Sequence, residues 1–331
     1  MENKITEKDK ILVAGSRGMA GSAICRSLLK KGYGNTIKSG ELLLPTRNEL
    51  DLLNFSDVIK WFDTNRPEIV IIAAAKVGGI YANSKYPTEF ILENLKIQNN
   101  LIEASWKFGV KRLVFLGSSC IYPKYSNQPI KEEYLLQGGL ETTNEPYAIA
   151  KIAGIKLCQY LRQQYGFDAI SLMPTNLYGP NDNYHHENSH VVAALIKKFA
   201  DAKKNSYPSV TCWGTGEPLR EFMHVDDLGD AVVFALENWF PSLNENSKNL
   251  NDDSIYYLNV GTGKDIKIKK LAEIIATALN YKGEIVWDTS KPDGTPRKQL
   301  DISKIKNLGW KPKIELIDGI TETAKNYFSK I

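Results

Sequence analysis

The 331-residue sequence has no long apolar run, few cysteines and no large excess of either charge. Its apolar runs are far shorter than the roughly 20 residues of a membrane-spanning helix, and its first ten residues are charged, unlike a signal peptide. The four cysteines lie far apart without a CxxC pair, which argues against a disulfide framework or a zinc knuckle. The net charge of +4 comes from 42 basic and 38 acidic residues without a dense basic block. We therefore expect a cytoplasmic protein that binds neither nucleic acid nor a membrane.

The first half of the chain alternates short β-branched runs with stretches in which apolar residues recur every three or four positions. The expected strands cover residues 11–14, 42–44, 69–73, 113–116 and 170–173, and the expected helices cover 18–31, 56–65, 88–108 and 147–165. Such alternation is typical of βαβ units and a parallel sheet. The sequence therefore predicts an α/β fold with a Rossmann-type doubly wound parallel sheet.

A polar segment, residues 178–189, interrupts this rhythm with Gly, Pro, Asn, Asp and His, as long loops do. We expect the Rossmann domain to cover residues 1–180, with returning segments at about 221–238 and 255–265. A helix over 191–202 would belong to a smaller mixed α/β lobe, made of 181–220 and 282–331, that binds the substrate. Residues 244–253 are polar enough to predict a mobile loop.

Three glycines stand where the first expected strand meets the first helix, in Gly15-Ser16-Arg17-Gly18-Met19-Ala20-Gly21. Glycine lets the backbone turn tightly and approach a pyrophosphate, and the helix N-terminus offers unpaired N–H groups to its negative charge. A glycine triplet alone is weak evidence, but at the first βα turn it predicts a dinucleotide site. The GxxGxxG spacing differs from the usual GxGxxG and resembles that of extended short-chain dehydrogenases.

The choice between NAD and NADP is made at the end of the second strand, where an acid binds a ribose 2′-hydroxyl and an arginine binds a 2′-phosphate. The sequence there is Leu44-Pro45-Thr46-Arg47, without an acid at the tip. Arg17 adds a second guanidinium, which can bind a phosphate through two hydrogen bonds. NADP(H) is therefore the expected cofactor. The alternative is that both arginines are solvated surface residues.

Tyr147 and Lys151 lie one helical turn apart on the same helix face. A free tyrosine titrates near pH 10, but a nearby ammonium stabilises its phenolate, so the pair can exchange protons near neutral pH. Ser118 follows the fourth expected strand, at the sheet edge where α/β proteins bind ligands. The three residues resemble the catalytic triad of the short-chain dehydrogenase/reductase superfamily.

Seven segments resemble the GDP-L-fucose synthase family. They are AAAKVGGI (73–80), GSSCIYP (117–123), NEPYAIAK (144–151), MPTNLYGP (173–180), WGTG (213–216), REFMHVDD (220–227) and SKPDGTPRK (290–298). They extend over nearly the whole chain. The resemblance implies a GDP-4-keto-6-deoxymannose 3,5-epimerase and 4-reductase that forms a homodimer and uses NADPH.

The resemblance also implies roles for individual residues. Tyr147 would donate the proton, Ser118 would bind the ketone beside it, and Lys151 would bind the nicotinamide ribose. Cys120 and His190 would be the base and the acid of epimerisation. The residues implied at the cofactor are Leu116, Gly117, Ser118, Ser119, Pro174, Thr175, Asn176, Leu177 and His190, and those at the GDP-sugar are Asn176, Lys198, Trp213, Arg220 and Asp293. Lys198 stands where the family has an arginine, which keeps the charge but loses the planar guanidinium.

Several alternatives remain open. His186-Glu187-Asn188-Ser189-His190 has the letters of a zinc-binding HExxH helix. We expect no metal there, because the segment spans a loop and a helix start, so its histidines would not share a helical face. The chain could be a monofunctional 4-reductase for a GDP-4-keto-hexose or heptose that another enzyme epimerises. A non-enzymatic NADP-binding regulator would be expected to lack one of the triad residues.

Overall fold

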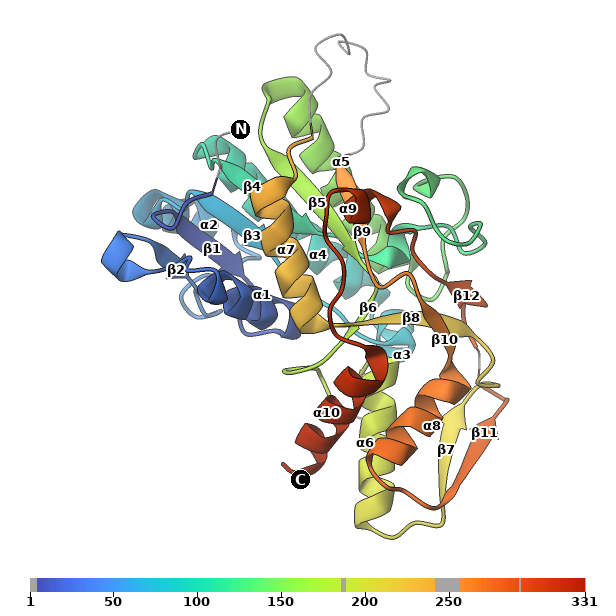
Figure 1. Ribbon diagram of the computed structural model, residues 1–331. Helices are drawn as coiled ribbons and strands as arrows, with labels where there is room; N and C mark the ends of the chain where they lie inside the picture. The colour runs from blue at the N-terminus through green and yellow to red at the C-terminus, as the bar shows by residue number, and fades with distance from the viewer. Residues whose placement is uncertain (1–4, 186–188, 242–255, 292, 331) are drawn as a thin grey trace.

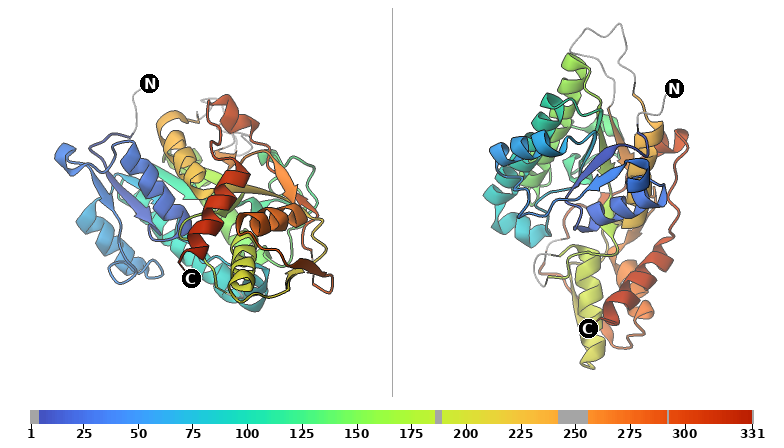
Figure 2. Two further views of the ribbon diagram at one scale, coloured as in Figure 1. Left: turned by 60° about the horizontal axis from the view of Figure 1, so that its bottom comes forward. Right: turned by 90° about the vertical axis from the view of Figure 1, so that its left-hand side faces the viewer.

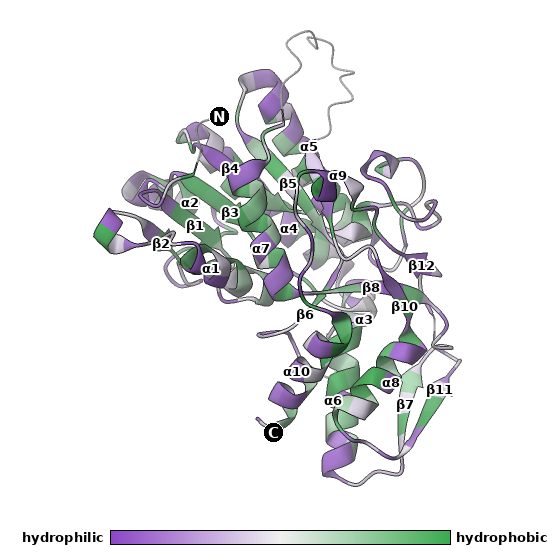
Figure 3. Cartoon of the chain, viewed as in Figure 1, coloured by the Kyte–Doolittle hydropathy of each residue, from purple (hydrophilic) through white to green (hydrophobic). Residues whose placement is uncertain are grey.

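A computed structural model describes residues 5–185, 189–241, 256–291 and 293–330 (Figure 1). Its main sheet has six parallel strands in the order β2-β1-β3-β4-β5-β9. Their bounds are β1 Lys10–Ala14, β2 Glu41–Leu43, β3 Ile69–Ile72, β4 Arg112–Leu116, β5 Ala169–Pro174 and β9 Tyr257–Val260. The inner strands are apolar along nearly their whole length (Figure 3), as they must be when helices cover both faces of a sheet.

The helices that cover the sheet form two layers. On one face, α1 (Met19–Lys30) packs beside α7 (Val225–Asn238). On the other face lie α2 (Phe55–Asn65), α4 (Pro87–Lys107) and α5 (Glu145–Tyr165), as Figure 2 shows. This arrangement confirms the predicted doubly wound α/β fold. The strand order reverses between β1 and β3, and such a reversal marks the ligand crevice at the carboxyl ends of the strands.

A second lobe lies below the sheet in Figure 1. Helices α6 (Val191–Lys204), α8 (Ile268–Ala278) and α10 (Leu316–Phe328) pack around a parallel pair of strands, β7 (Ser209–Trp213) and β11 (Glu284–Asp288). Its apolar side chains form a hydrophobic cluster separate from that of the main sheet. The mixed α/β lobe expected from the sequence is therefore present.

A small sheet joins the two parts. Strand β8 (Leu219–His224) pairs with β6 (Asn176–Tyr178), β10 (Asp265–Lys267) and β12 (Arg297–Lys298). Three of these four strands have two or three residues, too few for a periodic pattern, and the sequence analysis did not find them. The remaining short elements are α3 (Ile80–Lys85), α9 (Ser303–Asn307), η1 (Thr36–Lys38), η2 (Ser119–Ile121) and η3 (Glu132–Tyr134).

The C-terminal segment differs from the expectation in one respect. We expected all of 282–331 in the smaller lobe, but Leu300, Ile302, Ile305 and Trp310 are buried in the hydrophobic cluster of the main sheet. The Trp310 indole also donates a hydrogen bond to Asp230 on α7, at 3.0 Å. The chain returns to the first core because these apolar side chains cover it, and only then forms α10. The loop predicted over 244–253 lies outside the described residues.

Candidate active site

The glycine turn follows β1 and is fixed by close backbone contacts. Gly15 has φ +84°, and a Cβ there would lie 2.7 Å from the backbone of Ala74, which follows β3. A Cβ on Gly21 would lie 2.1 Å from the carbonyl oxygen of Gly15. Helix α1 begins after Gly18 without a side-chain cap, so its first N–H groups remain free to bind an anion. Of the other residues predicted in this turn, Ser16 is buried, and Met19 and Ala20 are half-buried.

The two arginines predicted to bind a 2′-phosphate, Arg17 and Arg47, are both exposed. The turn that carries Arg47 is held by Glu49, whose carboxylate accepts a hydrogen bond from the Thr46 N–H at 2.7 Å. This bond lowers the pKa of Glu49, and the charge of Arg17 lowers it further. Glu49 is an acid close to the strand end that the sequence analysis did not consider. Because it binds the backbone of the turn, it orders the loop beneath Arg47.

The triad residues meet at the carboxyl end of β4. Lys151, buried on α5, donates a hydrogen bond to the Leu116 carbonyl at 2.8 Å, and its Nζ lies 5.8 Å from the centre of the Tyr147 ring. Ser118 caps the short helix η2, and its hydroxyl accepts from the Cys120 N–H at 3.2 Å. Gly117 and Ser119 on either side are buried. The sequence spacing and the fold therefore bring all three predicted residues to one place.

Burial shifts the pKa values of Tyr147 and Lys151. It raises the pKa of the Tyr147 phenol well above the usual value, an effect that Cys120 reinforces and the Ser118 hydrogen bond opposes. Burial also lowers the pKa of Lys151 to about 7. The Tyr147 phenol is therefore protonated and able to donate. Lys151 can take up or release a proton near neutral pH.

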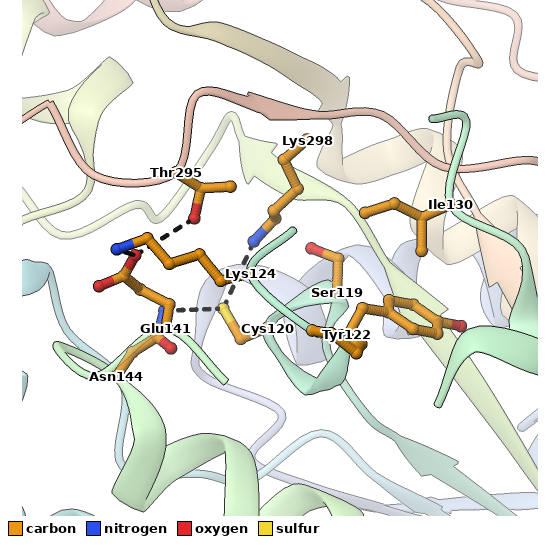
Figure 4. Close-up of a pocket in the computed structure, with 10 residues that line it drawn as sticks. Ser119, Cys120, Tyr122, Lys124, Ile130, Glu141, Asn144, Thr295 and Lys298 are labelled. Carbon is orange, nitrogen blue, oxygen red and sulfur yellow. Dashed lines mark hydrogen bonds and ion pairs between the residues drawn. The ribbon is translucent and has the colours of Figure 1, made fainter. Parts of the chain in front are cut away.

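Cys120 opens into a small cavity (Figure 4), lined by Ser119, Cys120, Tyr122, Pro123, Lys124, Ile130, Glu141, Asn144, Thr295 and Lys298. Its sulfur lies 3.5 Å from the Asn144 amide nitrogen and 3.5 Å from the Lys298 ammonium. The amide oxygen of Asn144 is buried and has no hydrogen-bond partner in the described structure. It can therefore accept a hydrogen bond from a ligand.

His190 precedes α6, at the entrance to the second lobe. The residue is exposed at the surface. Protein groups around its imidazole nevertheless disfavour the charged form and lower its pKa, and the charge of Lys298 lowers the pKa further. Lys298 therefore acts electrostatically on both His190 and Cys120, the two residues predicted to epimerise the sugar. The sequence analysis gave Lys298 no role, because only tertiary pairing of β12 with β8 brings it here.

Two lysine side chains lie beside an exposed indole ring of the second lobe. Trp213, at the end of β7, is 56% exposed. The Lys198 and Lys291 ammonium groups lie 5.3 and 5.7 Å from the centre of its ring. Lys198 also donates to the Thr211 carbonyl at 2.9 Å, and burial lowers its pKa. An exposed ring beside two cations suits a nucleotide diphosphate, and Lys291 is a further member that the sequence analysis missed.

Arg220 and Asp293 come together, although not as a simple ion pair. The Arg220 guanidinium donates to the Asp293 backbone carbonyl at 3.3 Å and to the Leu219 carbonyl at 2.9 Å. The Asp293 carboxylate accepts from the Thr215 N–H and the Thr215 hydroxyl, both at 2.8 Å. Asp293 thus orders the loop after β7.

The residues that follow β5 are tied to β8. The Thr175 hydroxyl and the Asn176 amide both donate to the Glu221 carbonyl, at 3.2 and 2.7 Å. Pro174 ends β5, and Leu177 packs against the main hydrophobic cluster. Glu221 itself is fully buried and accepts from the Gly263 and Leu300 N–H groups, at 2.8 and 2.7 Å. Its carboxylate joins the loop after β9 and the segment after β12 to β8, a role that the sequence analysis did not give it.

No group of three or more His, Cys, Asp or Glu side chains that could hold a metal occurs among the described residues. Residues 186–188 of the HExxH segment lie outside them. His190 is the residue before α6, so the last histidine of the segment does not lie within that helix. In the described part of the chain, no helix is long and apolar enough to cross a membrane.

Residues 11–247 match the NAD dependent epimerase/dehydratase family. The chain is 52% identical over 323 residues to "Probable GDP-L-fucose synthase 1" of Oryza sativa subsp. japonica, covering 97% of this chain and 93% of that protein. It is 50% identical over 316 residues to "GDP-L-fucose synthase" of Escherichia coli (strain K12), covering 96% and 95%. Among solved structures, a GDP-mannoheptose C4 reductase from Campylobacter jejuni with NADP bound superposes with a TM-score of 0.85 at 39% identity, covering 99% and 100%. The chain therefore belongs to the NAD dependent epimerase/dehydratase family and, within it, to the GDP-L-fucose synthase family.

Proposed function

We propose that this chain converts a GDP-4-keto-6-deoxy sugar to a GDP-L-fucose-type product, by 3,5-epimerisation followed by NADPH-dependent 4-reduction. The observation that carries this proposal is the shared strand end: Ser118 beside Tyr147 supplies proton donors for a ketone, and Cys120 two residues later is a base candidate. Relatives at 50% identity or more over nearly the full length support the same reaction.

The residues present fit NADPH. A Cβ would fill the backbone cradle at Gly15 and Gly21, and the uncapped start of α1 offers N–H groups to the pyrophosphate. Arg17 and Arg47 would bind the 2′-phosphate, and Lys151 the nicotinamide ribose. We place Leu116, Gly117, Ser118 and Ser119, with Pro174, Thr175, Asn176, Leu177 and His190, along the nicotinamide end. When bound, NADPH supplies the hydride that reduces C4.

The reduction needs a proton as well as a hydride. The Tyr147 phenol would donate to the C4 oxygen as it becomes an alkoxide, and the Ser118 hydroxyl would bind the same oxygen. Because burial keeps the phenol protonated, Tyr147 suits this donation. Lys151, with its pKa near 7, would return a proton to Tyr147 from solvent. These roles require that the ketone oxygen lie between the two hydroxyl groups.

A C4 ketone also acidifies the protons on C3 and C5, so the same oxyanion site can serve epimerisation. Cys120 would remove a proton from one face of the ring, and His190 would return one to the other face. The two residues belong to different parts of the molecule, since Cys120 follows β4 and His190 precedes α6. A sugar held between the two parts can therefore meet both residues at once.

The GDP moiety would bind on the second lobe. We place Trp213 against it, with Lys198 and Arg220 on the diphosphate, Asn176 near the sugar, and Asp293 ordering the loop that carries these contacts. Lys198 offers a single ammonium where the family has a guanidinium. Its hydrogen bonds to the diphosphate are therefore less directional than the paired bonds of an arginine.

A monofunctional 4-reductase is the second candidate, because the chain is similar to a C4 reductase. It is less well supported, since the identity to that protein is 39% against 52% and 50% for the two named relatives.

We further propose a cytoplasmic homodimer. Helices α4 and α5 leave Leu92, Ile149 and Tyr160 between 42% and 51% exposed, and a second copy would cover them.

The test is to incubate the protein with NADPH and a GDP-4-keto-6-deoxy sugar in deuterated water. The product is expected to carry solvent deuterium at C3 and C5. Cys120→Ala is expected to reduce this label by roughly 10²-fold or more, the usual size of acid–base catalysis, while NADPH affinity stays unchanged. Unlabelled product, formed only from a substrate already epimerised, would instead assign a monofunctional reductase.

A further inference from the structure

The proposed reaction gives no role to Lys298, whose ammonium faces the cavity beside Cys120. Its Nζ lies 3.5 Å from the Cys120 sulfur, and Figure 4 shows it approaching the thiol from a different direction than Asn144. Within the described part of the chain, Lys298 forms no ion pair with a carboxylate. The other lysine of the cavity, Lys124, is paired with Glu141 at 2.9 Å. Among the described residues, no carboxylate therefore pairs with the positive charge next to Cys120.

We propose that Lys298 is a positioning residue that holds Cys120 as the thiolate, and so prepares the base for epimerisation. This inference rests on the proposed function for its biological meaning. A cation this close favours the charged form of a thiol, and the thiolate is the form that accepts a proton. Asn144 stabilises the same charge, because its amide donates to the sulfur from the other side at 3.5 Å.

The remaining charged or titratable groups that face Cys120 fit this assignment. The Tyr147 phenol on α5 is neutral, and Cys120 raises its pKa further. Arg220 on β8 is a second cation that acts electrostatically on Cys120. Across the cavity, the charges of Lys124 and Glu141 offset each other. The net field at the sulfur is therefore positive.

Lys298 acts in the opposite sense on His190, whose protonated form it disfavours. A disfavoured imidazolium is a stronger acid. The Lys298 charge therefore favours the basic form of Cys120 and strengthens His190 as an acid. In each inversion the thiolate takes a proton from carbon, which gives a thiol and an enolate at C4. The imidazolium then gives its proton to the opposite face of that carbon and becomes neutral. Proton exchange with solvent restores the thiolate and the imidazolium, so no other reactant is consumed.

The first test measures the thiol directly, without any substrate. The rate of iodoacetamide alkylation is followed from pH 5 to 10 in the whole protein, with Cys120→Ala as the background. Cys25, Cys158 and Cys212 are buried, and burial raises the pKa of each, so they contribute little. In Lys298→Met the midpoint of the alkylation curve is expected to rise by about one pH unit or more. Lys298→Arg is expected to restore most of this change.

The matched control is the double variant Lys124→Met with Glu141→Gln, which removes an offsetting pair of charges from the same cavity without removing a contact to Cys120. Its midpoint is expected to stay near that of the wild type. NADPH affinity shows that each variant is folded. An unchanged curve in Lys298→Met, or an equal shift in the double variant, would overturn the assignment.

The second test measures deuterium exchange at C3 and C5 against reduction of an already epimerised substrate. Lys298→Met is expected to slow exchange near pH 7 about tenfold, the ratio that follows from a one-unit shift, and raising the pH is expected to recover it. Reduction should change less than exchange. Equal losses at every pH would show a general structural role and overturn the proposal. Wild-type protein that exchanges nothing would refute the proposed epimerisation, while the alkylation curves would still decide the thiolate assignment.

Discussion

The parallel-sheet region and the smaller lobe contribute to the site in different ways. In the sheet region, Tyr147 and Lys151 come from one helical turn, and Lys151 is buried with its ammonium bound to the end of β4. In the lobe, Trp213 is mostly exposed, and its loop is held by contacts between residues 78 positions apart, such as Thr215 with Asp293. The residues proposed for ketone reduction thus come from local structure, and the residues proposed to bind the GDP moiety come from separate segments that the fold must assemble.

This comparison predicts that substitutions in the sheet region change chemistry or cofactor binding, and that substitutions in the lobe change substrate affinity. The largest effect is expected from Tyr147→Phe, which keeps the ring and removes the donated proton. Ketone reduction should fall about 10²- to 10⁴-fold, while NADPH affinity and solvent exchange into the substrate persist. Tyr160→Phe, on the exposed face of the same helix, is the control. Single-turnover reduction at the wild-type rate would remove Tyr147 from the mechanism.

A smaller effect is expected from Arg47→Ala, which tests the cofactor end of the sheet region. Hydrogen bonds to a charged phosphate contribute about 1.5–3 kcal/mol, so NADPH should bind roughly 10- to 100-fold more weakly. NADH affinity should not change, because NADH lacks the 2′-phosphate. Titrations of both cofactors measure this, with Arg66→Ala, an exposed arginine paired with Asp63, as the control. Equal losses for both cofactors would contradict the assignment.

The buried lysine predicts a pH dependence of stability. The pKa of Lys151 is about 7 when folded and 10.5 as its ordinary value, so the unfolded chain binds more protons between these limits. The free energy of unfolding therefore gains a contribution that increases with pH across this window, by at most about 1.4 kcal/mol per pH unit. Lys151→Met lacks this contribution. Urea unfolding of both proteins without cofactor at pH 7, 8 and 9 measures it, and parallel pH dependences would show that Lys151 is not desolvated.

The smallest effect is expected in the lobe. Lys198→Arg restores the guanidinium typical of the family, which can bind the diphosphate through two hydrogen bonds where an ammonium acts as a point charge. The KM for the GDP-sugar should fall a few-fold, with little change in kcat. Steady-state kinetics measure this. A lower kcat with an unchanged KM would show that Lys198 takes part in the chemistry and would contradict its assignment to substrate binding.

Prediction from the sequence was accurate where the pattern was local. Five strands and four helices of the first half begin and end within two residues of the expected positions. All but β2 are long enough to repeat their own period, and the three-residue β2 was found from its place between two helical patterns. The short strands β6, β10 and β12 were missed, because two or three residues carry no period and exist only through pairing with β8. The burial of Trp310 was missed for the same reason, since it depends on a core formed elsewhere in the chain.

The sequence alone determined the glycine turn, the Tyr147–Lys151 pair and the serine at the strand end, because a turn of helix or a strand end fixes the spacing of such residues. Only the tertiary structure decided that Lys298 contacts Cys120 and that Glu221 joins two loops across the molecule. Residues 178 positions apart have no common local geometry, and their contact depends on how β12 pairs with β8. The residue proposed to donate a proton to the ketone could therefore be found from neighbouring residues, whereas the charge proposed to act on Cys120 could not.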